Sequence, residues 1–186
     1  GQHIDTADAT VTLARIPVVR LRHGQPQNLL QGQASFGETV AAIQKSLTQP
    51  ELFICLRKKQ VICGDQPVQL PDAELAWLAW WAQQTINGSP HKSWRDFCDD
   101  ETLWRAYMQI YKIIAPVGSY ENACKRLQNT EDRKGIFEQR SSKLNRILQN
   151  TLGHAAPNYQ LKTYGRRPHT QRGLGVPAIN ITLVID

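Results

Sequence analysis

The end of the chain reads YQLKTYGRRPHTQRGLGVPAINITLVID over residues 159–186, and it follows IFEQRSSKLNRILQNTL at residues 136–152. The apolar residues of the second stretch recur at helical spacing, and Gly153 is suited to end a helix there. Residues 159–186 begin as a strand, pass through a basic loop at residues 165–173, and end as an apolar strand. The sequence therefore predicts a long helix followed by a hairpin with a basic tip.

A predicted β-meander and a core helix precede this ending. Residues 51–70, ELFICLRKKQVICGDQPVQL, contain three short apolar runs separated by turns, which predict a meander. Residues 72–86 keep helical spacing and are apolar nearly all round, as a central core helix is. Trp77, Trp80 and Trp81 belong to this helix. They could form a base-stacking platform, but core packing is favoured.

Two further helices complete the predicted fold. A strong helix is expected over residues 102–115 and a short one after Ser119, whereas QNTEDRKG at residues 128–135 is expected to break the helical pattern. A β-meander, three main helices and a basic hairpin, in that order, describe a winged helix-turn-helix of the α+β class. The helix at residues 136–152 would be its recognition helix and the hairpin its wing.

The first part of the chain is expected to be an extension of this domain. Residues 10–22 are rich in β-branched residues and predict a strand, and residues 35–47 predict a short amphipathic helix that opens on a capping box. We therefore divide the chain into an extension or linker over residues 1–50 and a winged-helix domain over residues 51–186.

The positive charge of the protein is concentrated in one segment. The chain has 186 residues and a formal net charge of +6. Residues 131–173 contain nine of the 22 Lys and Arg and three of the 16 Asp and Glu, so the rest of the chain carries thirteen of each. Such a surplus favours a polyanionic partner, because counterion release grows with the local number of cations. No apolar run approaches the roughly 18 residues of a membrane span, so no membrane partner is expected.

The candidate contacts to nucleic acid lie on the last helix and in the basic hairpin. Arginine can pair with guanine, and glutamine or asparagine with adenine, whereas cations on a wing contact the backbone. The predicted helix contacts are Gln139, Arg140, Ser142, Lys143, Asn145 and Arg146. The predicted hairpin contacts are Lys162, Arg166, Arg167, His169 and Arg172.

The sequence offers little for catalysis. His169 could act as a general acid beside its arginines, but no second titrating partner is near in sequence, so phosphate contact is favoured. The helical Arg–His motif of HEPN ribonucleases is absent, since Gly153 breaks the helix between Arg146 and His154. The acidic run at residues 99–101 is expected to cap a helix. The four cysteines form no CxxC pair, which indicates reduced thiols in a cytoplasmic protein rather than zinc. We assign no catalytic residue, metal or cofactor.

The chain from Leu52 onward resembles the winged-helix domains of response regulators of the OmpR/PhoB type. GDQPVQLPDAELAWLAWWA at residues 64–82 resembles the run into their first helix, and RSSKLNRIL at residues 140–148 resembles their third helix. In such domains the third helix enters the major groove of duplex DNA and the wing touches the backbone or minor groove. The resemblance implies the same roles here.

A second resemblance covers more of the chain. The run from ATVTLARIPVVRLRHG, together with LPDAELAWLAWWA and YGRRPHTQRGLGVP, is similar to the C-terminal part of a CRISPR-associated family of antiviral defence. Those proteins carry an N-terminal CARF sensor domain and are named as ring nucleases. Since this sequence begins with Gly1 and lacks the sensor loops, the chain is expected to be the appended module, without the ring-nuclease residues. A homodimerisation or docking module that binds no nucleic acid stays open as an alternative.

Overall fold

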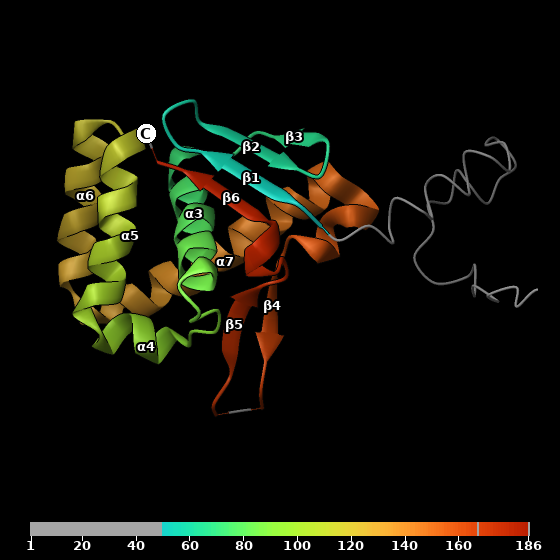
Figure 1. Cartoon of the computed structure of the whole chain (residues 1–186). Helices are drawn as coiled ribbons and strands as arrows, with labels where there is room; N and C mark the ends of the chain where they lie inside the picture. The colour runs from blue at the N-terminus through green and yellow to red at the C-terminus, as the bar shows by residue number, and fades with distance from the viewer. Residues whose placement is uncertain (1–49, 167, 186) are drawn as a thin grey trace, which may run out of the picture.

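The computed structural model describes residues 50–166 and 168–185 (Figure 1). Within these ranges the protein is a mixed α+β fold with two small sheets and five α-helices. The predicted α+β class is confirmed. The strand expected over residues 10–22 and the helix expected over residues 35–47 lie outside the described residues, and so does Arg167 of the basic loop.

The larger sheet contains the predicted meander and one strand from the end of the chain. Its antiparallel part is β1 (Leu52–Cys55), β2 (Gln60–Cys63) and β3 (Gln66–Val68). The fourth strand, β6 (Ile181–Val184), pairs in parallel with β1, which gives the order β3-β2-β1-β6. The prediction that the terminal apolar strand belongs to the hairpin is therefore wrong. Ile181 instead lies opposite Leu52, and both side chains are buried.

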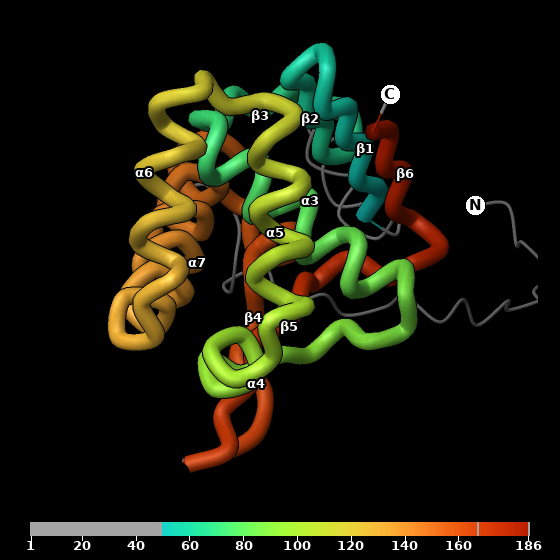
Figure 2. The backbone as a smooth tube through the Cα atoms, turned by 90° about the vertical axis from the view of Figure 1, so that its left-hand side faces the viewer, coloured from blue at the N-terminus to red at the C-terminus, as the bar shows by residue number. Residues whose placement is uncertain are grey.

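The smaller sheet is a hairpin that projects from the body of the molecule, away from the larger sheet (Figures 1 and 2). It consists of β4 (Leu161–Tyr164) and β5 (Gln171–Leu174), and we call residues 161–174 the basic hairpin. Lys92, from the loop before α4, forms an isolated bridge with Arg172, with N–O distances of 2.9 and 2.8 Å between the two backbones. The hairpin is thus attached to the helical part at a third backbone segment.

Helix α3 (Asp72–Ile86) lies beneath the larger sheet and forms the centre of the core (Figure 1). Trp77, Trp80 and Trp81 are all 0% exposed, which confirms core packing and excludes a base-stacking platform. The Trp77 and Trp80 rings stack with their centroids 4.8 Å apart. The Trp77 indole N–H donates to the Ser141 hydroxyl at 3.2 Å, so α3 is joined to the last helix by a buried hydrogen bond.

Three helices connect α3 to the last helix. They are α4 (Trp94–Asp99), α5 (Glu101–Ile114) and α6 (Val117–Gln128). Helix α5 confirms the strong helix predicted there, and Asp100 caps it by accepting from the Thr102 N–H at 2.8 Å, as expected of the acidic run. Helix α4 was not predicted, although Ser93 and Asp96 form a capping box at its start. This box is the sequence signal that could have located the helix.

The last helix, α7, extends over Thr130–Leu152 and ends at Gly153, as predicted, but it begins before Ile136. Residues 128–135 therefore do not break the helical pattern. Asn129 caps α7 by accepting from the Glu131 N–H at 3.1 Å, and Glu131 and Asp132 suit the positive end of the helix dipole. Arg133 then anchors the first turns, since it donates to the carbonyls of Leu127 and Cys98 at 2.6 and 2.7 Å.

Candidate nucleic-acid interface

One face of α7 carries a row of exposed polar side chains. Gln139, Ser142 and Arg146 are all exposed, and Lys143 is partly exposed. At about 100° of rotation per residue, these four residues fall on one side of the helix. Arg146 makes no ion pair within the described part of the chain. These are the predicted helix contacts that the structure brings together on an outward face.

A neighbouring flank of α7 is tied to the core through a buried carboxylate. Glu74 of α3 is 0% exposed. Its Oε1 lies 2.5 Å from Arg140 Nη1 and 3.2 Å from Lys143 Nζ. A buried carboxylate is costly unless it is paired, so this contact commits the Arg140 guanidinium to α3. The pairing also fixes the rotation of α7 about its axis, which keeps Gln139 and Arg146 on the outside.

Asn145 joins α7 to the basic hairpin. Its side-chain oxygen accepts from the Leu161 N–H at 2.8 Å, and its amide nitrogen donates to the Leu161 carbonyl at 2.9 Å. Gln160 adds a third bond by donating to the Asn145 carbonyl at 2.9 Å. Asn145, predicted as a base contact, therefore has its amide occupied by the backbone at the start of β4.

The tip of the basic hairpin presents cations outward. Arg166 and His169 are exposed at the tip, and Lys162 is exposed on β4. The tip is closed by the His169 N–H, which donates to the Arg166 carbonyl at 2.9 Å. Gly165 has a φ of +77°, and a Cβ there would lie 2.9 Å from the His169 carbonyl oxygen, so the turn requires glycine.

The root of the hairpin is packed against its surroundings on both sides. Arg172 pairs with Glu138 of α7, and its guanidinium carbon lies 5.9 Å from the centroid of the Phe137 ring. On the other side, a Cβ at Gly173 would approach the His91 ring to 2.5 Å. Arg172 was predicted as a backbone contact for nucleic acid, but its ion pair with Glu138 attaches the hairpin to α7.

A groove lies between α4, α7 and the basic hairpin, with a volume of about 540 Å³. The partly exposed ring of Trp94 lines it, with Lys134 Nζ 4.6 Å and Arg95 Cζ 5.3 Å from the ring centroid. Thr163 and Thr170 contribute hydroxyl groups from the hairpin. The sequence analysis placed neither Trp94 nor these two cations in the site. The only signal was their membership of a basic sequence with an aromatic residue.

Comparison of the chain with protein-family models, with curated proteins and with solved structures gives no match. The interface must therefore be judged from its own residues. Among the described helices, none combines the length and apolar character needed to cross a membrane. In the same part of the chain, no group of three His, Cys, Asp or Glu side chains is placed to hold a metal ion.

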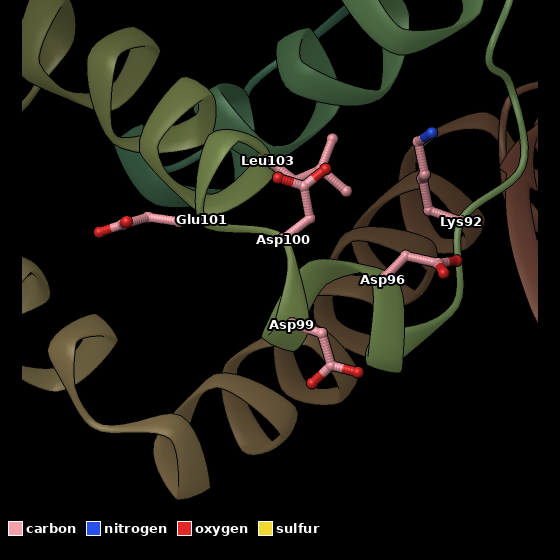
Figure 3. Close-up of a pocket in the computed structure, with 6 residues that line it drawn as sticks. All are labelled: Lys92, Asp96, Asp99, Asp100, Glu101 and Leu103. Atoms are coloured by element: carbon pink, nitrogen blue, oxygen red, sulfur yellow. The ribbon is translucent and has the colours of Figure 1, made fainter.

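A second hollow, of about 520 Å³, is lined mainly by acidic residues around the α4–α5 junction (Figure 3). Its carboxylates do not converge: Asp96 caps α4, Asp100 caps α5, and the side chains of Asp99 and Glu101 point in different directions (Figure 3). Glu101 is also paired with Arg105 at 2.7 Å. This hollow is therefore explained by helix capping and shows no arrangement for metal-dependent chemistry.

Proposed function

We propose that residues 51–186 form a winged helix-turn-helix module that binds duplex DNA, with α7 as the recognition helix and the basic hairpin as the wing. One observation carries the proposal. The outward face of α7 lies beside a hairpin whose tip exposes Arg166 and His169, and neither Arg146 nor Arg166 is neutralised by a carboxylate of the described chain.

The two parts of this surface suit different contacts. Gln139 and Arg146 lie on the same face of α7, and they can pair with adenine and guanine in the major groove. Lys143 keeps 38% of its side chain exposed and can add a contact at the edge of this face. The hairpin cations suit the phosphate backbone, which holds the module in register without reading sequence. Arg140, Asn145 and Arg172 support the surface from behind.

We further propose that the module belongs to a CRISPR-associated protein of the CARF type. This proposal depends on the resemblance of YGRRPHTQRGLGVP and the preceding segments to that family. In this view the chain is an accessory module, and the sensing of cyclic oligoadenylate resides elsewhere in the parent protein. Cyclic oligoadenylate is accordingly expected to leave DNA binding by this chain unchanged.

A fluorescence-anisotropy titration tests the DNA-binding proposal. Labelled duplex DNA, single strands and duplex with cyclic oligoadenylate are titrated at about 50 and 200 mM salt. The double variant Arg166→Ala/Arg167→Ala is expected to weaken binding to all duplexes similarly and to reduce the salt slope by about 2. Arg57→Ala/Lys58→Ala removes the same charge from the exposed β1–β2 turn, at the opposite end from the hairpin (Figures 1 and 2), and serves as the matched control. Equal affinity in the Arg166/Arg167 variant and the wild type would exclude the wing role.

A protein-docking function is the second candidate, because β6 is an edge strand of the described sheet and Ile179 beside it is 88% exposed. An exposed strand edge can pair with a second chain. A stable oligomer that is insensitive to salt, together with no binding to any nucleic acid in the titration above, would favour this candidate over the first.

A further inference from the structure

The groove beside Trp94 carries a positive charge that the rest of the structure leaves unused. Arg95 and Lys134 are both exposed, and neither makes an ion pair within the described ranges. Glu138 is an acidic residue of the groove lining, and its carboxylate is paired with Arg172. The groove is therefore net positive.

The position of the groove connects it to the outward face of α7. Lys134 and Glu138 are one helical turn apart on α7, and Asn145 lies on the same flank at about 100° per residue. Asn145 bonds to the start of β4, so this flank is the one that faces the hairpin. Ser142 and Arg146 lie roughly 60–100° further round the helix. The groove thus runs between the hairpin and the face that presents the polar side chains.

The chemistry of the groove matches a sugar–phosphate chain. Two cations and the hydroxyls of Thr163 and Thr170 can donate to phosphate oxygens, which are the most frequent protein partners in nucleic-acid complexes. The partly exposed Trp94 ring offers an apolar surface of the kind that packs against a sugar or base. An acidic or neutral apolar ligand would match only one of these two features.

We infer that this groove holds one strand of the DNA backbone, with Lys134 and Arg95 contacting phosphates and Trp94 packing against the adjoining sugar. This inference rests on the proposed DNA-binding function and adds a second backbone contact on the body of the module, between the recognition helix and the wing. The contact is independent of sequence, because the groove presents no side chain that is placed to read a base edge.

The double variant Arg95→Gln/Lys134→Gln tests the phosphate contacts. Two duplexes of unrelated sequence are expected to lose affinity by the same factor, and the salt slope should fall by about 2, as for two lost phosphate contacts. Arg57→Gln/Lys58→Gln is the control with the same change of charge, and Lys134→Arg should restore part of the slope. A loss confined to one duplex would contradict a backbone contact.

Intrinsic tryptophan fluorescence gives an independent readout of the groove. The chain has five tryptophans. Trp77, Trp80 and Trp81 are 0% exposed and Trp104 is 8% exposed, so Trp94 is the one whose surroundings a surface ligand changes. DNA is expected to change the fluorescence of the wild type but not that of Trp94→Phe. If the wild type binds DNA while the Arg95/Lys134 variant matches the control or Trp94→Phe keeps the change, the groove inference fails and DNA binding stands. If the wild type binds no DNA, both fail.

Discussion

Asn145 illustrates, at the scale of single residues, how α7 divides its polar side chains between structure and recognition. Both backbone groups of Leu161, a buried residue, are satisfied by this one amide. Asn145→Ala leaves the two groups without their partner, so we expect the free energy of unfolding to fall by about 2 kcal/mol. Ser142→Ala, on the same helix but exposed, is the control and should change it by less than about 0.5 kcal/mol. Urea unfolding measures both, and equal midpoints for the two variants would show that Asn145 does not hold the hairpin.

Glu74 has a comparable role from the core side. A glutamate at the centre of an apolar helix is out of place unless a cation reaches it, and Arg140 and Lys143 do so from α7. Two of the cations in the basic segment are thus partly or wholly spent on one buried carboxylate. The charge surplus of the segment therefore overstates the charge available to a ligand, and Arg146, Lys162 and Arg166 carry a larger share of any phosphate binding.

At the scale of elements, local patterns identified the meander, α3 and α5, because their apolar spacing and caps lie within a few residues of each other. They failed where the stabilising contact is distant. The first turns of α7 depend on Arg133, which bonds to the carbonyl of Cys98, 35 residues away along the chain. Likewise the partner of Arg140 is Glu74, 66 residues away, so the sequence could locate the candidate helix but not which of its faces is outward.

The placement of β6 is the element whose correction matters most for the fold, and it can be tested with one matched pair of variants. Ile181 in β6 is 9% exposed and lies opposite Leu52, whereas Ile179 just before the strand is 88% exposed. Ile181→Ser is expected to lower the free energy of unfolding by about 3 kcal/mol through lost core packing. Ile179→Ser should change it by less than about 0.5 kcal/mol. Thermal melts that rank the two variants in the opposite order would place the terminal strand outside the larger sheet.

At the scale of the whole molecule, the core joins the larger sheet to the helices through buried groups that resist ionisation, and this predicts how stability depends on pH. Burial raises the pKa of Cys63 from 9.0 to about 12 and that of Tyr159 from 10.0 to about 12. Burial also raises the pKa values of Tyr107 and Tyr111. The folded protein therefore keeps protons that the unfolded chain releases, and the slope of stability with pH has a negative sign above the lower of these values.

The stabilising effect is complete below about pH 9 and should be lost progressively as the pH rises from about 9 to 12. Urea unfolding at about pH 7, 9 and 11 is expected to give equal midpoints at the first two values and a clearly lower midpoint at the third. Cys63→Ala removes the thiol that titrates first in the unfolded chain, so the decline in this variant should begin nearer pH 10, where the tyrosines ionise. A midpoint that stays constant to pH 11 would mean that these groups ionise as readily in the fold as in water, which is incompatible with the packing of α3 between the larger sheet and α7.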